Sequence, residues 1–283
     1  MEIFEEIEPL RAFLKGKRAA LKSIGLVPTM GALHKGHLAL IRASKAQNEV
    51  TISSIYINPT QFNNQADLDK YPRMREADIK LLETEGCDVL FAPSNTEMYS
   101  GYQSLTFDFG TLDKVLEGKF RPGHFSGVAL VVSKLFNIVQ PDRAYFGQKD
   151  YQQFQVIRRL NEELKFSIEL HSVPIVREES GLALSSRNQR LNEQDKKNAL
   201  FLYDTLSNAK VQLLKGMPFS EIKTEAETRA KKKGEVKLEY FELANKNTLQ
   251  ELEDVNDFKN GILLIAAFVS DVRLIDNMLL VAE

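Results

Sequence analysis

The sequence predicts an α/β protein in which a domain built on a parallel sheet is followed by a smaller α+β domain. In the first half, short apolar runs alternate with stretches whose apolar residues recur every three to four positions, the pattern of strands joined by helices. After Asn188 the pattern changes to two helices and then three extended runs. We therefore expect a Rossmann-like domain over residues 1–180 and a smaller α+β domain over 181–283, with the boundary near 177–187 and the Ser-Ser-Arg loop there as a hinge.

Five short apolar or β-branched runs are the expected strands of the first domain. They are Ile24–Val27, Val50–Ile57, Asp88–Phe91, Arg143–Gly147 and Ser167–Val173. Helices are expected at Glu5–Leu21, from Leu38, at Met74–Glu85, over 128–139 and from Gln148 through Leu160. The stretch Pro93–Gly110 is irregular, although Leu105–Phe107 could add a strand.

The second domain begins with two helices whose ends are marked by glycine and proline. One helix covers Ala199–Leu214 before Gly216 and Pro218, and the next covers Phe219–Lys233 before Gly234. Three strands are then expected, at Val236–Ala244, Ile262–Val269 and Val272–Leu280.

Composition and charge argue against nucleic-acid-binding, membrane-spanning and disulfide-rich proteins. The chain has 283 residues and a net charge of −2, so no overall basic field would attract nucleic acid, and we expect no nucleic-acid partner. No apolar run approaches the roughly 20 residues of a membrane helix, and the acidic start lacks the order of a signal peptide. The single cysteine, Cys87, excludes a disulfide framework and fits a small core residue. We expect a cytoplasmic protein without a membrane partner.

Two histidines, His34 and His37, stand where the first strand gives way to a helix. Two glycines, Gly31 and Gly36, lie beside them, and His37 falls in the first helical turn. A helix N-terminus offers unpaired N–H groups and a positive dipole, and glycine permits close approach, so this segment suits phosphate. The alternatives are a loop with two solvated histidines, and half of a zinc site without its cysteines.

Polar residues follow the other strands at the same predicted edge, where ligands of open α/β sheets bind. Asn58 and Gln61 follow the second strand, where Asn58-Pro59 could also simply form a turn. Lys149 and Asp150 follow the fourth strand, and a Ser-Ser-Arg turn, 185–187, closes the first half. The run 116–125 is rich in glycine and basic residues, which fits either a mobile flap over an anionic ligand or an ordinary solvated loop.

One further pair of carboxylates, Asp67 and Asp69, could be read as a metal site. Exposed carboxylates before a helix more often cap it or stay solvated, so we expect no metal ligand among the side chains.

The run P-T-M-G-A-L-H-K-G-H at 28–37 resembles the signature of the pantothenate synthetases, or pantoate–β-alanine ligases, within the His-x-Gly-His nucleotidyl-transferase superfamily. Other segments are similar to that family: N-P-T-Q-F at 58–62, the Gly- and Arg-containing run at 117–125, G-Q-K-D at 147–150 with Gln153, and S-S-R at 185–187. Gln148 stands where the family usually has an acidic residue, which puts in doubt a charge near the nucleotide.

The resemblance implies ATP-dependent condensation of pantoate with β-alanine through a pantoyl adenylate, with Mg²⁺ bridging the phosphates and the enzyme acting as a homodimer. It implies catalytic roles for His34, His37, Lys149, Ser185, Ser186 and Arg187. It implies ATP binding by Met30, Gly31, Ala32, Leu33, His34, Lys35, Gly36, His37, Gly147, Gln148, Lys149, Asp150, Val176, Leu184, Ser185, Ser186 and Arg187. It implies substrate binding by Asn58, Gln61, Arg121, His124 and Gln153.

Two other functions stay open on the sequence. A nucleotidyltransferase acting on a phosphate-bearing substrate would share His-x-Gly-His but would not need N-P-x-Q-F or Gln153. A nucleotide-binding regulator could keep the fold without turnover, although all the polar phosphate ligands are present here.

Overall fold

A computed structural model of the chain describes residues 1–252 and 258–281. The chain divides into two compact units, which we describe separately. The first comprises Met1–Gln148 and Gln152–Pro174, and the second comprises Lys149–Tyr151 and the described residues from Ile175 onward. The boundary expected at residue 180 falls inside the second unit.

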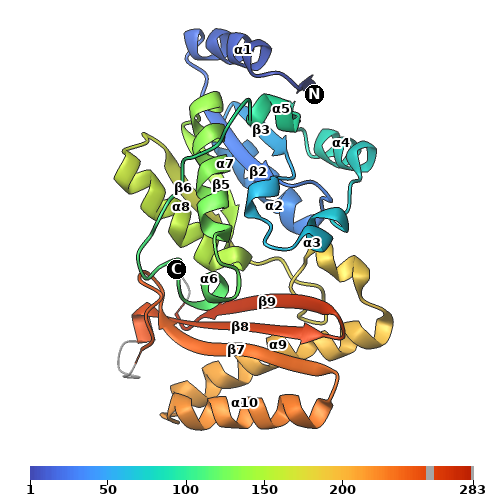
Figure 1. The fold of residues 1–283 in the computed structure, drawn as a ribbon, viewed down its shortest axis with the longest axis vertical. Helices are drawn as coiled ribbons and strands as arrows, with labels where there is room; N and C mark the ends of the chain where they lie inside the picture. Colours follow the sequence, from blue (N-terminus) through green and yellow to red (C-terminus); the bar gives the residue numbers. More distant parts are fainter. Residues whose placement is uncertain (253–257, 282–283) are drawn as a thin grey trace. The chain divides into compact units, whose positions relative to one another are not determined.

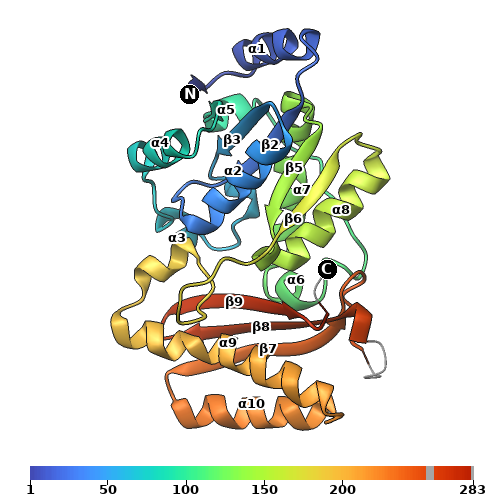
Figure 2. The same ribbon diagram turned by 180° about the vertical axis from the view of Figure 1, so that it is seen from behind.

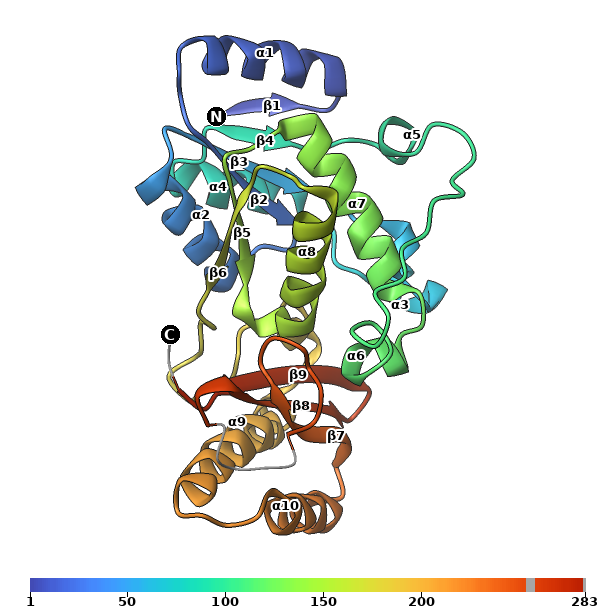
Figure 3. The same cartoon turned by 90° about the vertical axis from the view of Figure 1, so that its left-hand side faces the viewer.

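The first unit is built on a parallel sheet in the order β1-β4-β3-β2-β5-β6, of which Figure 1 labels β2, β3, β5 and β6, and Figure 3 also labels β1 and β4. Its strands are β1 (Glu2–Phe4), β2 (Ile24–Thr29), β3 (Val50–Ile55), β4 (Val89–Phe91), β5 (Arg143–Gly147) and β6 (Glu169–Val173). After β2 the chain adds β3 and then β4 on one side of it, and it later places β5 and then β6 on the other side. A ligand crevice is expected at such a switch point, beyond the carboxyl ends of β2 and β5.

Helices cover both faces of this sheet (Figure 3). The longer ones are α1 (Ile7–Ala19), α2 (Lys35–Gln47), α4 (Arg75–Thr84), α7 (His124–Val139) and α8 (Tyr151–Leu164), and the short ones are α3 (Gln65–Asp69), α5 (Asn95–Met98) and α6 (Leu116–Phe120). Neighbouring strand residues point to opposite faces. Val27, Leu90 and Tyr145 therefore belong to the core under α2 and α4. Their neighbours Leu26, Phe91 and Phe146 belong to the core under α1, α7 and α8.

The predicted α/β class and all five predicted strands are confirmed, with differences at a few places. β1 was not expected, because three residues of an acidic N-terminus carry little strand pattern. Strand β2 continues through Pro28 to Thr29. Pro28 is tolerated there because β2 pairs with β5 only at Gly25 and Leu26, so the missing N–H falls beyond that ladder.

The additional strand suggested at Leu105–Phe107 is wrong. The backbone N–H of Phe107 donates to Ser126 Oγ at 2.9 Å, and its ring stacks on Phe109. The run 116–125 is not a bare loop either, because Leu116–Phe120 is helical and Leu116, Glu117 and Gly118 are buried. Its mobility as a flap stays a prediction.

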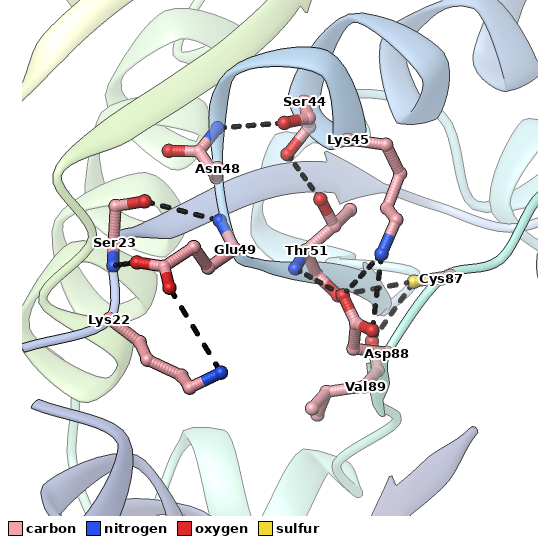
Figure 4. A network of polar contacts seen from close by, with 10 residues as sticks. All are labelled: Lys22, Ser23, Ser44, Lys45, Asn48, Glu49, Thr51, Cys87, Asp88 and Val89. Carbon is pink, nitrogen blue, oxygen red and sulfur yellow. Dashed lines mark hydrogen bonds and ion pairs between the residues drawn. The ribbon is translucent and has the colours of Figure 1, made fainter. Parts of the chain in front are cut away.

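Polar contacts tie the amino-terminal edge of the sheet together (Figure 4). The carboxylate of Asp88 accepts from the Thr51 backbone N–H at 2.7 Å and from Lys45 Nζ at 2.9 Å. Ser44 Oγ, in the last turns of α2, lies 2.8 Å from Thr51 Oγ1. Cys87 is buried here, and burial raises the pKa of its thiol to about 11, which suits the core role predicted for it.

The second unit contains an antiparallel sheet of β7 (Val236–Asn245), β8 (Gly261–Val269) and β9 (Val272–Leu279), in that order. Two helices, α9 (Glu193–Leu214) and α10 (Phe219–Lys233), lie against one face of it (Figure 2). Phe201 and Leu206 of α9 and Ile222 of α10 share a core with Phe241 and Ile265 of the sheet. The predicted small α+β arrangement is confirmed.

In the described part of the chain, no helix combines the length and the apolar character required to cross a membrane.

Helix α2 approaches β2 so closely that only glycine fits at position 25. A Cβ on Gly25 would lie 2.2 Å from Ser44 Oγ and 2.5 Å from Asn48 Nδ2. We predict that Gly25→Ala lowers the free energy of unfolding by about 2 kcal/mol, because two buried, hydrogen-bonded side chains must shift. Gly16→Ala in α1 is the matched control, since nothing lies within 4 Å of its added Cβ, and it should stabilise by about 0.5–1 kcal/mol. Urea unfolding of both variants checks this, and equal effects would contradict the packing argument.

Candidate active site

The turn between β2 and α2 has an unusual backbone. Gly31 has φ +81° and Ala32 has φ +49°. A left-handed conformation costs a residue with a side chain about 1–2 kcal/mol, so other contacts must hold Ala32 in it. Gly31 is also enclosed, because a Cβ there would lie 3.0 Å from Asp78 Oδ2 and 3.1 Å from Ile55 Cγ2.

Asp78, from the first turn of α4, provides those contacts. One carboxylate oxygen accepts from the Leu33 N–H at 2.7 Å and the other accepts from the Ala32 N–H at 2.9 Å. Asp78 is only 2% exposed. Burial raises the pKa of this carboxyl, and the two N–H donors oppose that rise.

The two histidines cap helix α2 from its start. His34 is the N-cap residue, and its Nδ1 accepts from the Gly36 N–H at 3.1 Å. The Nδ1 of His37 accepts from the His34 N–H at 3.3 Å, which completes a reciprocal capping box. The ring centroids are 4.1 Å apart. Because each Nδ1 accepts a backbone hydrogen bond, each neutral ring carries its proton on Nε2 and is a donor there.

The side-chain amide of Gln61 is fixed by the side chains of Asn58 and Met30. Its Oε1 accepts from Asn58 Nδ2 at 3.2 Å, and its Nε2 donates to the sulfur of Met30 at 3.0 Å. Asn58 is 1% exposed and also donates to the Gly127 carbonyl at 3.0 Å, while its Oδ1 accepts from Tyr99 Oη at 2.8 Å. The amide of Gln61 is therefore oriented so that its second Nε2 hydrogen can serve a ligand.

His124 and Arg121 extend this group. The Nδ1 of His124 lies 2.7 Å from the Gln61 carbonyl oxygen, and its Nε2 lies 3.1 Å from Arg121 Nη1. A carbonyl can only accept and a guanidinium can only donate, so His124 is neutral with its proton on Nδ1. This is the opposite tautomer from that of His34 and His37.

The predicted residues of the first unit thus form connected groups, although they lie up to 94 positions apart in sequence (30 to 124). Met30, Asn58, Gln61, Arg121 and His124 are linked by the contacts above. Lys35 is exposed at the first position of α2, and Gly36 leaves room for the His34 ring, since a Cβ would lie 2.8 Å from its Cε1. Gln153 is half-buried in the first turn of α8.

Gly147 ends β5 in the first unit, and Gln148 follows it in a short 3-10 helix, η2 (Gln148–Asp150). Lys149 and Asp150 belong to the second unit, where the Lys149 carbonyl accepts from Asn277 Nδ2 of β9 at 2.9 Å. Lys149 is half-buried and Asp150 is exposed.

The segment that leads to the Ser-Ser-Arg turn is held by a partly buried ion pair. Arg177 donates to both oxygens of Asp276, at 2.6 and 2.9 Å, and to the Gly181 carbonyl at 3.1 Å. The Leu184 N–H donates to the Val176 carbonyl at 3.0 Å, so 176–184 folds back on itself. Ser185 then caps the 3-10 helix η3 (Ser186–Arg190), accepting from the Arg187 N–H at 3.2 Å. Its hydroxyl hydrogen is left for another acceptor.

Sequence reasoning missed Asp78 and Asp276, which hold these two segments. A signal for Asp78 exists, because it falls one helical turn before Leu82, on the face of α4 that is otherwise apolar. Asp276 had a weaker signal, since nothing in sequence links a strand residue to an arginine 99 positions earlier.

No group of three or more His, Cys, Asp or Glu side chains within 1–252 and 258–281 could hold a metal ion. Asp67 and Asp69 lie in and at the end of the short helix α3.

Comparison with known proteins gives a consistent result over the whole chain. Residues 2–279 match the model of the family described as Pantoate-beta-alanine ligase. Pantothenate synthetase of Cytophaga hutchinsonii is 47% identical over 276 residues, covering 97% of this chain and 98% of the relative. That of Bacteroides fragilis is 46% identical over 278 residues, covering 98% of each.

Solved structures agree. The crystal structure of pantothenate synthetase from Thermus thermophilus has a TM-score of 0.92 and 39% identity, with all of both chains covered. Pantoate-beta-alanine ligase from Francisella tularensis, solved in complex with beta-gamma ATP and beta-alanine, has a TM-score of 0.79 and 35% identity, with 100% of this chain and 99% of that one covered. The chain belongs to the pantoate–β-alanine ligase family.

Proposed function

We propose that this protein uses ATP to condense pantoate with β-alanine, through an enzyme-bound pantoyl adenylate, releasing AMP and pyrophosphate. The family and the Francisella tularensis complex support ATP and β-alanine as ligands. The observation that carries the proposal is the pair of histidines capping α2, whose two Nε2–H donors stand at a helix N-terminus.

The first half-reaction requires little beyond orientation and charge neutralisation. A carboxylate oxygen of pantoate attacks the α-phosphorus of ATP, the bond to the bridging oxygen breaks, and pyrophosphate leaves with the electron pair. His34 and His37 donate to the phosphoryl oxygens as charge develops on them. Lys149, Ser185, Ser186 and Arg187 are proposed, on the resemblance alone, to donate to phosphate oxygens of ATP as well.

Two amides, those of Gln61 and Gln153, are proposed to bind pantoate. The fixed orientation of Gln61 presents an Nε2–H donor, which suits a carboxylate or hydroxyl oxygen. The resemblance implies that Asn58 binds substrate, but both of its amide hydrogens are used within the protein, so we propose that it orients Gln61 instead. Arg121, held by His124, is proposed to face the anionic ligands.

The nucleoside is assigned on the resemblance. Asp150 is proposed to bind ribose hydroxyls, and the backbone around Met30 and Val176 to border adenine. In the second half-reaction the β-alanine amine attacks the acyl carbon, a C–N bond forms, the amine loses a proton and AMP leaves.

Three further features stay proposals that rest on the family. Mg²⁺ would enter with ATP, taking its ligands mainly from phosphate and water, because no cluster of suitable side chains was found in the described residues. The active species is proposed to be a homodimer, and its location the cytoplasm.

Isotope exchange tests the function. With ATP, Mg²⁺ and pantoate present and β-alanine absent, labelled pyrophosphate should exchange into ATP, because adenylation alone is reversible. A transferase for phosphate-bearing substrates would exchange only with its own substrate, and a nucleotide-binding regulator would not exchange at all. Absence of exchange with pantoate and ATP saturating, or exchange that needs no pantoate, would contradict the proposal.

We predict that His37→Ala still folds, losing about 1 kcal/mol of stability with its capping bond, but slows this exchange by about a hundred-fold or more, about 3 kcal/mol, because one transition-state donor is lost. His37→Gln, which returns an amide donor, should recover part of the rate. Arg42→Ala is the matched control, since Arg42 lies on the exposed side of the same helix, paired with Glu85, and its loss should leave the rate unchanged. A folded His37→Ala protein with the rate of the unaltered enzyme would exclude the role.

A further inference from the structure

We propose that Asp78 is a positioning residue for the phosphate-binding turn, acting through the backbone and not by contact with substrate. This inference rests on the proposed function only for its consequence in catalysis. The geometry it describes, a carboxylate holding the turn that presents His34 and His37, stands on the contacts alone.

Both oxygens of Asp78 are committed to the turn. Oδ1 accepts from the Leu33 N–H at 2.7 Å and Oδ2 from the Ala32 N–H at 2.9 Å, short distances typical of charge-assisted bonds. Ala32 is 1% and Leu33 is 7% exposed. Without the carboxylate, two buried N–H groups would lack a partner, at a cost large enough to favour a different turn.

The turn cannot hold its shape by local preference. Ala32 lies in the left-handed region, which few residues with a side chain adopt without support. The carboxylate compensates for this by satisfying the N–H groups in only that arrangement. Thr29 contributes a second, neutral contact, because its Oγ1 accepts from the Gly31 N–H at 3.2 Å.

Displacement of the turn would reach the histidines directly. Leu33 immediately precedes His34, and the His34 N–H is the group that the Nδ1 of His37 accepts from. If that N–H moves, the capping box opens, and the two rings lose both their orientation and the tautomer that places a donor on Nε2.

Asp78→Asn is the informative substitution, because asparagine has nearly the same shape but only one acceptor oxygen, and its NH₂ group must face a backbone N–H. Asp88→Asn is the matched control. Asp88 also accepts from a backbone N–H of the first unit, that of Thr51, but at the amino-terminal edge of the sheet (Figure 4).

The readout is ¹⁵N and ¹³C NMR of protein labelled at histidine. The chain has four histidines, His34, His37, His124 and His171, so each can be assigned by single replacement with glutamine. In the unaltered protein, His34 and His37 should show the Nε2–H form and His124 the Nδ1–H form. Asp78→Asn should shift the signals of His34 and His37 and leave those of His124 and His171 in place, whereas Asp88→Asn should shift none of the ring tautomers.

Catalysis gives a second, separable result. We expect Asp78→Asn to lower the maximal rate of pantoate-dependent exchange by at least ten-fold, and Asp88→Asn to lower it by less than two-fold. If the unaltered protein catalyses no exchange but the His34 and His37 signals still respond to Asp78→Asn, the proposed function fails and the positioning role stands. Unchanged His34 and His37 signals in folded Asp78→Asn, or equal shifts from Asp88→Asn, would overturn the positioning role.

If Asp78→Asn does not fold, amide hydrogen exchange of the unaltered protein tests the positioning role instead. The amides of Ala32 and Leu33 lie outside any helix or strand, yet they should exchange at least a hundred-fold more slowly than an open turn. Exchange at the rate of an unprotected turn would overturn the proposal.

Discussion

The first unit depends on one constraint at its ligand edge: the backbone N–H groups of a short, buried turn must all find acceptors. Asp78 accepts two of them, Thr29 accepts a third, and the histidine rings accept two more. Because the rings are used as acceptors at Nδ1, they are donors at Nε2. The hydrogen bonds that cap the start of α2 therefore also fix the tautomers of His34 and His37, the residues proposed to bind phosphate.

Similar internal hydrogen bonding fixes the side chains around Gln61 and Arg177. Asn58 is anchored by the Gly127 carbonyl and donates its other amide hydrogen to Gln61, and His124 is held as the neutral Nδ1–H tautomer by a carbonyl and a guanidinium. In the second unit, the bidentate Arg177–Asp276 pair holds the segment that leads to Ser185. Because these contacts lie within the protein, they orient the side chains proposed to bind substrate before any substrate arrives.

The sequence was sufficient for the fold class, the strands and most helices, because apolar periodicity in segments such as Arg143–Gly147 and 128–139 is set locally. Prediction from the sequence failed where contacts distant in the chain determine the local structure. β1 forms by pairing with β4, and the backbone N–H of Phe107 donates to Ser126 instead of to a neighbouring strand. For the site, the residue types at strand ends predicted His34, His37 and Gln61. The roles of Asp78 and Asp276 depend on partners 45 and 99 positions away, and Asn58 is anchored by Gly127, 69 positions away; spacing in the sequence does not reveal these contacts. The assignment of these residues to substrates stays a prediction.

The central claim is that the carboxylate of pantoate attacks the α-phosphorus of ATP, and oxygen transfer tests it most directly. Pantoate labelled with ¹⁸O in its carboxylate is incubated with the enzyme, ATP, Mg²⁺ and β-alanine, and the nucleotide and phosphate products are examined by mass spectrometry. We expect one ¹⁸O atom in each AMP formed and none in pyrophosphate, because the acyl oxygen stays on the α-phosphorus when the amine displaces AMP. Label in inorganic phosphate together with ADP, or unlabelled AMP, would contradict that claim.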